Sequence, residues 1–370
     1  MHPACQGGIL VKPGAGSKIV LGMSGGVDSS VAAALLKDQG YDVIGVMLRL
    51  WSDSETENRC CAPDAQLEAR RVASQLDIPF YVVDAQEAFY QAVVQPFIDS
   101  YAAGNTPNPC LNCNRQIRWQ FLRSRAKALG AEYISTGHYA RIEASEDGGY
   151  RLLKNPDLDK DQSYFLHVLT QEDLSRTIFP LADLSKPEVR QLAREFGLAV
   201  AERPDSQDLC FIGHGNYRDF LRNVNPSSIK PGPILDLEGS VLGKHQGLAD
   251  YTIGQRKGLG IAGAEPYYVI EKDLENNALI IGFKNKLGRI GFYAAGINWI
   301  NGESPSKSIN ADIRIRYKSK AVPGKITPLD NNLAQIDLTD SLPDITPGQA
   351  AVFYQGQICL GGGIIQREAL

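Results

Sequence analysis

A short apolar run that passes directly into a glycine-rich turn and a helical pattern dominates the beginning of the sequence. Residues 19–21 form the apolar run, and residues 28–39 have the apolar spacing of a helix that ends before Gly40. A second apolar run, residues 43–48, follows the helix. A strand, a helix and a second strand in this order predict a βαβ unit, with the glycine-rich turn at the carboxyl end of its first strand.

The same alternation of strands and helices continues to about Gly137. Residues 65–76 and 115–129 have helical patterns, and residues 80–83 and 133–135 are typical of short buried strands. Because parallel strands need crossover helices that cover both faces, we expect an α/β domain with a parallel sheet. Ligands of such sheets bind at the carboxyl ends of the strands.

The texture of the sequence changes beyond about Gly213. Turn-rich stretches such as residues 258–263 separate short segments, and apolar and polar residues alternate at residues 312–318 and 334–338, which predicts a small antiparallel barrel. The chain of 370 residues also exceeds the length at which one core usually stops growing, about 250–300 residues. We expect an α/β domain over residues 1–213, a central domain over 214–286 and a C-terminal antiparallel β-barrel over 287–370.

The composition is that of an ordinary globular protein. Hydrophobic residues make up 43% and charged residues 22%, and the net charge is −4, so a nucleic acid would have to bind a local basic patch. No apolar run approaches the ~20 residues that span a bilayer, and a signal peptide pattern is missing, so we expect a soluble cytoplasmic protein without a membrane partner. Seven cysteines are too few, and odd in number, for a secreted disulfide framework, which leaves reactive or metal-binding thiols.

The glycine-rich turn has the composition of a phosphate-binding loop. Its sequence GMSGGVDSS covers residues 22–30, between the first strand and the first helix. Glycines let an anion approach the backbone, serines donate hydrogen bonds, and the helix adds unpaired N–H groups. The loop lacks the lysine of a Walker A motif, which favours release of pyrophosphate over transfer of a γ-phosphoryl group. An ordinary glycine-rich turn is the alternative interpretation.

This loop resembles the PP-loop of ATP pyrophosphatases, and together with further blocks it resembles the bacterial tRNA-specific 2-thiouridylases. The further blocks are residues 106–114 (TPNPCLNCN), 136–141 (TGHYAR), 160–166 (KDQSYFL), 205–212 around Cys210, 251–261 (YTIGQRKGLGI), 346–354 (TPGQAAVFY) and 361–363 (GGG). They follow in order over nearly the whole chain. The resemblance implies an adenine nucleotide α-hydrolase-like PP-loop domain that binds ATP, a small central domain and a barrel that contacts tRNA.

The resemblance implies an ATP-dependent sulfurtransferase that acts on the wobble uridine of tRNA. In the implied reaction the C2 oxygen of the base attacks the α-phosphate of ATP and pyrophosphate leaves. Sulfur then replaces the activated oxygen, which gives 2-thiouridine and AMP. Mg²⁺ would neutralise the phosphates. The implied substrates are lysine, glutamate and glutamine tRNAs, the implied donor is an upstream persulfide or sulfur-relay protein, and the implied state is a monomer.

The residues that the resemblance assigns to the two substrates are spread along the chain. Those for ATP are Gly22, Met23, Ser24, Gly25, Gly26, Val27, Asp28, Ser29, Leu48 and Gly137. Those for tRNA are Asn108, Pro109, Cys110, His138, Lys160, Asp161, Gln162, Arg316, Tyr317 and Gln349. His138 follows a predicted strand at the ligand edge of the sheet, which favours a functional role over a structural one.

Two cysteines would carry the sulfur chemistry, and a third departs from the family pattern. The resemblance assigns the persulfide intermediate to Cys210 and the nucleophile to Cys113, with a transient disulfide between them. Cys110 stands where many members have an aspartate, so it is an auxiliary thiol candidate. With Cys113 and Cys210 it offers three ligands for a 4Fe–4S cluster. A redox-active C-x-x-C pair, a structural zinc site and a merely tolerated thiol are the other interpretations.

Two basic stretches indicate RNA binding without the resemblance. The first, on an acid-free predicted helix, comprises Arg115, Arg118, Arg123, Arg125 and Lys127. The second, on one face of a predicted strand, comprises Arg314, Arg316, Lys318 and Lys320. Such clusters neutralise phosphates, although each is equally compatible with an ordinary solvated face.

Two other classes of protein remain open. One is a different PP-loop adenylating enzyme, such as an amidotransferase or a ligase, which would not need the three cysteines. The other is a non-catalytic RNA-binding or redox-sensing protein that keeps a nucleotide pocket. Release of pyrophosphate that depends on tRNA separates the enzyme from such a binder.

Overall fold

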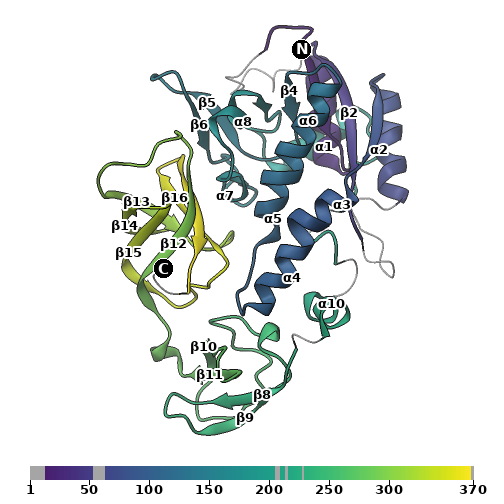
Figure 1. Ribbon diagram of the computed structural model, residues 1–370. Helices are drawn as coiled ribbons and strands as arrows, with labels where there is room; N and C mark the ends of the chain where they lie inside the picture. Colours follow the sequence, from purple (N-terminus) through teal and green to yellow (C-terminus); the bar gives the residue numbers. More distant parts are fainter. Residues whose placement is uncertain (1–12, 53–62, 205–208, 213–215, 227–228, 368–370) are drawn as a thin grey trace.

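The computed structural model describes residues 13–52, 63–204, 209–212, 216–226 and 229–367, so residues 205–208 of the block around Cys210 lie outside it. A parallel sheet with helices, a small four-stranded sheet and an antiparallel barrel follow one another along the chain (Figure 1). The predicted fold class is therefore confirmed. Within the described residues, none of the helices is both long and apolar enough to cross a bilayer.

The first sheet is parallel throughout. Its strand order is β3 (Phe80–Asp84), β2 (Asp42–Arg49), β1 (Lys18–Gly22), β4 (Tyr133–Ser135) and β7 (Thr177–Ile178). The chain adds β2 and β3 on one side of β1 and β4 on the other, so the loops after β1 and β4 share a crevice at the carboxyl edge. No periodicity indicates β7, because two residues are too few to show one.

Alternation along β1 separates two cores. Ile19 and Leu21 pack into the first core and Val20 into the second, and all three are fully buried, as a parallel sheet covered on both faces requires. The helices of the first core are α1 (Val27–Asp38), α2 (Pro63–Gln75) and α9 (Lys186–Glu195). Trp119 and Leu122 bring the opposite helical run into the second core.

That helical run extends from Pro109 to Ala128. It consists of α5 (Pro109–Asn112), the π-helical stretch η3 (Cys113–Phe121) and α6 (Leu122–Ala128). Asn108 caps its start, because its side-chain oxygen accepts a hydrogen bond from the Cys110 N–H at 3.2 Å, and proline suits the first helical position. The helix predicted at residues 115–129 therefore begins earlier, and Cys110 and Cys113 lie in its first turns.

The remaining helices are short and connect the larger elements. They are α3 (Gln86–Phe89), the π-helical stretch η2 (Tyr90–Val94), α4 (Gln95–Ala102), α7 (Ser163–Leu166), α8 (Gln171–Ser175), α10 (Tyr217–Val224), η5 (Leu248–Asp250) and η6 (Lys284–Lys286). A capping box of Thr170 and Asp173 begins α8. Thr170 Oγ1 accepts a hydrogen bond from the Asp173 N–H, and Asp173 Oδ2 accepts one from the Thr170 N–H.

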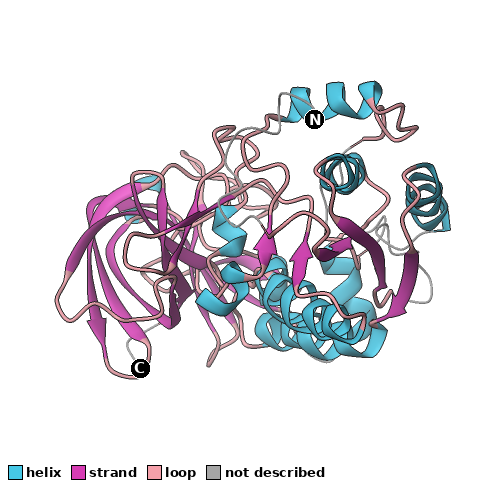
Figure 2. Ribbon diagram, turned by 90° about the horizontal axis from the view of Figure 1, so that it is seen from above, coloured by secondary structure: helices cyan, strands magenta, loops and turns pink. Residues whose placement is uncertain are grey.

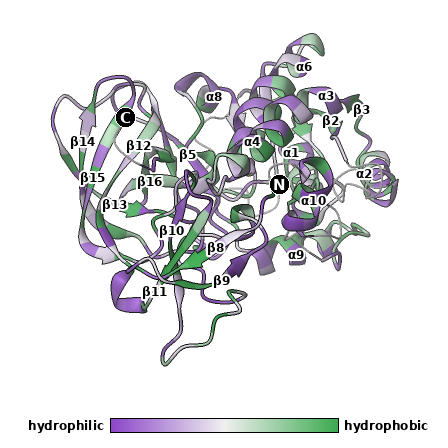
Figure 3. Ribbon diagram, turned by 60° about the horizontal axis from the view of Figure 1, so that its bottom comes forward, coloured by the Kyte–Doolittle hydropathy of each residue, from purple (hydrophilic) through white to green (hydrophobic). Residues whose placement is uncertain are grey.

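The central sheet has its own small core. Its strand order is β10 (Tyr268–Asp273), β11 (Ala278–Gly282), β8 (Gly232–Leu235) and β9 (Val241–His245). Ile234, Val269, Leu279 and Ile281 bury their side chains on one side of it. Figure 3 shows the hydrophobic character of β8 against the more polar loops around this sheet.

The C-terminal barrel is a ring of six antiparallel strands that a pairing of its first and last strands closes. The strands are β12 (Arg289–Trp299), β15 (Leu333–Leu342), β14 (Val322–Leu329), β13 (Ile309–Arg314), β16 (Ala350–Gln355) and β17 (Ile358–Ile365). The hairpin β5 (Arg141–Ala144) and β6 (Tyr150–Leu153) of the preceding region pairs with the start of β17. The barrel therefore continues a sheet that begins in the first domain; Figure 2 shows it at the end of the molecule that carries the C-terminus.

Alternation predicts one barrel strand correctly and overextends another. Residues 334–338 alternate between buried and less buried positions within β15, as predicted. β13, however, ends at Arg314, and the Ser319 N–H donates to the Arg316 carbonyl at 3.1 Å in a turn. The prediction that Arg314, Arg316, Lys318 and Lys320 share one strand face is therefore wrong, because a turn replaces the ladder after Arg314.

Candidate active site

The glycine-rich loop curves around the start of α1 at the carboxyl edge of the parallel sheet. Ser29 Oγ accepts a hydrogen bond from the Ser24 N–H at 3.2 Å and donates to the Gly26 carbonyl at 3.2 Å. Ser30 Oγ donates to the same carbonyl at 2.9 Å. Gly26 is the N-cap and has no side chain to cover the first N–H groups of α1, so they can serve an anion.

Close backbone approaches explain two glycines of the predicted site. Gly25 has a φ of +71°, and a Cβ at this position would collide with the carbonyl oxygen of Ala65. A Cβ on Gly137, directly after β4, would lie 2.8 Å from the Ser29 nitrogen. The loops after β1 and β4 therefore touch each other, as the expected ligand crevice requires.

Charged residues from distant segments meet this loop. Asp28 Oδ1 accepts hydrogen bonds from Lys186 Nζ at 2.7 Å and from the Tyr139 hydroxyl at 2.6 Å. Lys186 begins α9 and is only 8% exposed. Arg203 Nη1 donates to the Gly25 carbonyl at 2.9 Å. No motif indicates Lys186 or Arg203, since each is an isolated basic residue far along the chain, yet together they place two cations beside a loop that has none of its own.

Cys113 and Cys210 belong to one apolar cluster. This thiol cluster consists of Leu50, Ala85, Phe89, Val93, Val94, Phe97, Ile98, Tyr101, Cys113, Ile117, Phe211, Ile212, Phe220, Leu221 and Ala249. Cys210 is half-buried and packs against it, whereas Cys113 is 8% exposed. Both residues are thiols in this structure. The fold thus brings two cysteines that are distant in sequence into the same apolar surroundings.

The thiol cluster lies next to the nucleotide loop. Leu50 follows β2 and Ala85 follows β3, so the cluster begins at the same carboxyl edge that carries the loop after β1. Leu48, one of the residues assigned to ATP, packs against both this cluster and the second core. Cys113 also opens the π-helical stretch, a helical irregularity that is frequent at functional sites.

A cavity of about 440 Å³ opens beside the start of the cysteine helix. Its lining includes Asn108, Leu111 and Asn112 from the helix start, and Gly348 and Ile365 from the barrel. Cys110 is half-buried in the first turn, between the capping residue Asn108 and Cys113. Of the residues assigned to tRNA, Asn108 lines this concave junction of the first domain and the barrel, and Pro109 and Cys110 follow it in the first turn without lining the cavity.

His138 is buried and paired at both ring nitrogens. Arg118 Nη1 lies 3.0 Å from Nε2, and Thr136 Oγ1 lies 2.6 Å from Nδ1. Burial, and then the Arg118 guanidinium, hold the pKa of His138 well below its usual range. A neutral ring accepts from Arg118 at Nε2 and donates from Nδ1 to Thr136. With 5% of its surface exposed, His138 is arranged to orient its neighbours, and direct contact with tRNA remains a prediction.

The side chains of Asp161 and Gln162 accept hydrogen bonds from backbone N–H groups of neighbouring segments. Asp161 is fully buried, accepts from the Asn155 and Ser163 N–H groups at 3.1 Å, and lies 3.4 Å from Arg314 Nη1. Burial raises the pKa of Asp161 despite these bonds. Gln162 Oε1 accepts from the Tyr139 N–H at 3.0 Å. Lys160 and Gln162 are both half-exposed, whereas Asp161 between them is fully buried.

Three further residues assigned to tRNA lie where domains meet. Arg316 Nη2 donates to the carbonyl of Ile253 at 3.3 Å and to Thr346 Oγ1 at 2.8 Å. Tyr317 packs its ring 4.5 Å from that of Phe165. Gln349 Nε2 donates to the Thr106 carbonyl at 2.8 Å. The structure therefore places these side chains between elements, where they fix the relative positions of the domains.

The predicted basic helix is partly neutralised. Arg123 Nη1 lies 2.9 Å from Asp173 and 3.3 Å from Glu172, and Arg125 stacks on Phe121 at 4.7 Å. Arg115 is exposed. The outward cations of the helix are thus fewer than the sequence indicates, because a neighbouring helix supplies carboxylates.

Cys110, Cys113 and Cys210 do not form a metal-binding arrangement. Among the described residues, no three histidine, cysteine, aspartate or glutamate side chains gather closely enough to hold a metal ion. The donor set needed for a 4Fe–4S cluster is therefore not assembled in this conformation.

The chain matches three family models in sequence order. They describe a tRNA methyl transferase HUP domain at residues 17–214, a tRNA methyl transferase PRC-barrel domain at 218–283 and an aminomethyltransferase beta-barrel domain at 289–365. A tRNA-specific 2-thiouridylase of Roseiflexus castenholzii is 46% identical over 95% of this chain and 100% of that protein. One of Moorella thermoacetica is 48% identical over 95% of this chain and 99% of that protein.

Overlap with solved structures is weaker. A 4-thiouridine synthetase in complex with RNA and ATP is 16% identical, has a TM-score of 0.35, and covers 57% of this chain and 51% of that chain. An overlap of this size carries no argument about function.

Proposed function

Because this chain belongs to the family of tRNA-specific 2-thiouridylases, we propose that it uses ATP to replace the C2 oxygen of the wobble uridine of tRNA with sulfur. The chain is a tRNA-modifying sulfurtransferase, an enzyme. One structural observation supports the assignment most directly: a phosphate-binding loop and an apolar cluster with two thiols lie at the same edge of one parallel sheet.

The loop from Gly22 to Ser29 binds the phosphates of ATP in this proposal. Unpaired N–H groups at the start of α1 and the hydroxyl of the exposed Ser24 face the anion, and Gly137 and Leu48 close the pocket around the nucleotide. The C2 oxygen of uridine attacks the α-phosphate, the bond to the β-phosphate oxygen breaks, and pyrophosphate leaves. The adenylated base then has AMP as its leaving group.

A single carboxylate fits the demand of Mg²⁺ in such a site. Magnesium bound to a nucleotide usually takes one or two protein carboxylates in addition to phosphate oxygens and water. Asp28, in the first turn of α1, is the carboxylate that would hold it. When bound, the ion neutralises charge that develops on the departing pyrophosphate.

The thiol cluster supplies the sulfur. An upstream donor leaves a persulfide on Cys210, and the Cys113 thiolate attacks the inner Cys210 sulfur. A disulfide forms between the two cysteines, sulfide is released, and this sulfide attacks C2 and displaces AMP. An external dithiol or two thiols must then reduce the disulfide before the next turnover. Cys110 is an auxiliary thiol in this scheme, and the apolar surroundings keep water away from the activated base.

Ten residues bind or position tRNA in this proposal: Asn108, Pro109, Cys110, His138, Lys160, Asp161, Gln162, Arg316, Tyr317 and Gln349. The 440 Å³ cavity at Asn108 supports a place for the target base. Lysine, glutamate and glutamine tRNAs are the proposed substrates of a monomer that works in the cytoplasm, where thiols stay reduced.

Domains over 1–213, 214–286 and 287–370 are supported by the change from parallel to antiparallel sheets and by the ranges of the family models.

Nucleoside mass spectrometry tests the proposal. Unmodified tRNA is incubated anaerobically with ATP, Mg²⁺, a persulfide donor, a dithiol reductant and rigorously iron-free protein. We expect 2-thiouridine over multiple turnovers, with pyrophosphate released in proportion. Activity that appears only after iron and sulfide are restored would instead assign Cys110, Cys113 and Cys210 to a cluster.

Two outcomes would reject the proposal. No 2-thiouridine under either condition would favour another PP-loop adenylating enzyme, an amidotransferase or a ligase. No pyrophosphate release in the presence of tRNA would favour a non-catalytic RNA-binding or redox-sensing protein. Two of the matching family models are described as tRNA methyl transferase domains. A methylated uridine would be distinguished from 2-thiouridine by its mass in the same measurement.

A further inference from the structure

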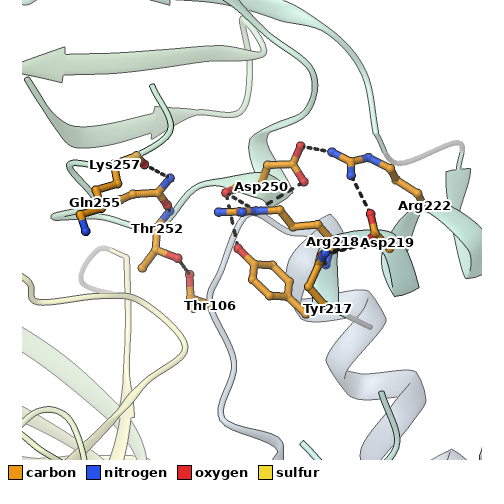
Figure 4. Close-up of polar contacts among 10 residues, drawn as sticks. Thr106, Tyr217, Arg218, Asp219, Arg222, Asp250, Thr252, Gln255 and Lys257 are labelled. Atoms are coloured by element: carbon orange, nitrogen blue, oxygen red, sulfur yellow. Dashed lines mark hydrogen bonds and ion pairs between the residues drawn. The ribbon is translucent and has the colours of Figure 1, made fainter. Parts of the chain in front are cut away.

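A short segment of the central domain contacts α10, which follows Cys210 in the sequence, and Thr106, which precedes the cysteine helix. This junction segment is Asp250–Thr252, at the end of η5. Its neighbour Ala249 is itself a member of the thiol cluster, together with Cys113 and with Phe220 of α10. A loop of the central domain therefore takes part in the cluster that contains Cys113. On either side of Tyr251, Asp250 contacts α10 and Thr252 contacts Thr106 (Figure 4).

Asp250 holds α10, the helix that follows Cys210 in the sequence. Its Oδ2 accepts from Arg222 Nη2 at 2.6 Å, and its Oδ1 lies 4.0 Å from Arg218 Nε. Its backbone carbonyl also accepts from Arg218 Nε at 3.0 Å and from the Tyr217 hydroxyl at 3.4 Å. Asp250 is only 7% exposed, whereas the Arg218 and Arg222 side chains are 41% and 42% exposed, so water reaches these ion pairs from the arginine side. Figure 4 shows the three α10 side chains converging on this one residue.

Thr252 holds the segment that precedes Cys110 and Cys113. Its hydroxyl lies 3.4 Å from the hydroxyl of Thr106. Thr106 is fixed in turn by the barrel, since its N–H donates to the Pro347 carbonyl at 2.9 Å and its carbonyl accepts from Gln349. The Thr252 backbone is itself pinned, because its N–H donates to Gln255 Oε1 at 3.1 Å. One side of the junction segment is thus tied to the Cys113 helix and the other to the Cys210 segment.

We propose that the junction segment Asp250–Thr252 positions the two thiols against each other, with Asp250 and Thr252 as positioning residues for the Cys113–Cys210 pair. The assignment of these thiols to sulfur transfer rests on the proposed function, whereas their positioning rests on the contacts alone. Asp250 fastens the Cys210 segment through α10, and Thr252 fastens the Cys113 segment through Thr106. Reactions between two such groups depend steeply on their alignment, so loosening either tie lowers the rate without removing a reacting atom.

The effective concentration of the Cys113–Cys210 thiol pair tests this positioning directly. The protein is equilibrated with reduced and oxidised glutathione, and peptide mass spectrometry quantifies this one disulfide. Each disulfide that forms gives two electrons and two protons to one glutathione disulfide, which becomes two glutathiones. We expect Asp250→Asn to lower the effective concentration about tenfold, the equivalent of about 1.4 kcal/mol. Thr252→Val should lower it by a smaller factor, because it removes a single hydroxyl contact.

Two matched variants serve as controls. Asp219→Asn removes the other carboxylate at Arg222, 3.2 Å from Nη1, but Asp219 lies on α10 itself and does not join α10 to the junction segment. Thr252→Ser keeps the hydroxyl. Both should retain the wild-type effective concentration, and in tRNA thiolation Asp250→Asn should lower kcat while the KM for ATP stays unchanged.

Unchanged effective concentrations in folded Asp250→Asn and Thr252→Val would overturn the proposal, as would an equal loss in Asp219→Asn. Thermal unfolding shows whether each variant is folded, and if Asp250→Asn does not fold, the Thr252→Val and Thr252→Ser pair decides. A wild-type protein that forms this disulfide but makes no 2-thiouridine would reject the proposed function and leave the positioning role intact.

Discussion

The nucleotide side and the thiol side of the site are built in different ways. The loop between β1 and α1 is a single stretch of sequence, and Ser24, Gly26, Ser29 and Ser30 hold it through bonds that span at most five positions. The thiol side instead joins the Cys113 helix, the Cys210 segment with α10, and the junction segment of the central domain. A local loop forms with its strand and helix, whereas the thiol side exists only once distant segments have docked.

Because of this difference, we expect substitutions on the two sides to affect different steps, ATP binding on one side and sulfur transfer on the other. A change in the loop should act on ATP and leave the thiols alone, because the loop's structure depends on its own residues. A change on the thiol side should act on sulfur transfer and leave ATP binding alone. Lys186 and Arg203 are the exceptions on the nucleotide side, since they reach the loop from elsewhere in the chain.

Removing the persulfide carrier should have the largest effect. Cys210→Ser is expected to lower the rate of 2-thiouridine formation roughly a thousandfold or more, because no other group can carry the transferred sulfur. ATP binding, measured by titration, should be unchanged. Cys359→Ala is the control: Cys359 is buried in β17, and burial raises its thiol pKa to about 12, so it should retain activity. Loss of ATP binding in Cys210→Ser would break the separation between the two sides.

Disabling the loop should come next. The double variant Ser24→Ala with Asp28→Ala is expected to lower tRNA-dependent pyrophosphate release by about two orders of magnitude or more, since it removes phosphate contacts and the carboxylate proposed for Mg²⁺. The Cys113–Cys210 effective concentration should stay at the wild-type value. Unchanged pyrophosphate release would sink the assignment of the loop.

Lys186 should have a smaller effect on the same side. Lys186→Gln removes a buried positive charge beside the triphosphate site, so we expect it to weaken ATP binding about tenfold, or about 1.4 kcal/mol. Lys186→Arg keeps the charge and should weaken it less. Titration of ATP into both variants measures this, and equal affinities of wild type and Lys186→Gln would show that the loop needs no distant cation.

Lys272, in the central domain, should affect the free energy of unfolding and leave ATP binding unchanged. It is 2% exposed, and burial followed by the Arg367 charge lowers its pKa from 10.5 to about 7. Between these two values the unfolded chain binds the proton and the folded chain does not, so this group makes the free energy of unfolding rise with pH from about 7 to 10.5.

Lys272→Met should remove this rise. The variant's advantage in the free energy of unfolding is expected to be greatest at pH 7 and below, and to shrink as the pH increases. Urea unfolding at several pH values measures the difference, and parallel curves for wild type and variant would contradict the pKa shift. ATP binding should match the wild type, because Lys272 lies in the central sheet and not at the nucleotide loop.

Local sequence determined the fold class and the nucleotide loop. The strands at residues 19–21, 43–48, 80–83 and 133–135 are found where the pattern predicts them. The central strand β1 is buried on both faces, whereas β3, at the edge of the sheet, is half-exposed and not buried as predicted. The nucleotide loop can also be predicted from the sequence, since its glycines and serines interact with residues within the same short stretch. Patterning was less reliable at the ends of elements: a turn at residues 316–319 stops β13, and a capping asparagine starts the cysteine helix earlier than its periodicity shows.

Only the tertiary structure decided how the site is assembled. Cys113 and Cys210, Asp28 and Lys186, and Asp250 and Arg222 are pairs whose members lie far apart in the sequence, and no periodicity links them. His138 shows the same limit, because its position after a strand is readable but its burial against Arg118 and Thr136 is not. Sequence patterns record local backbone preference and burial, whereas a long-range contact depends on which surfaces the folded domains bring together.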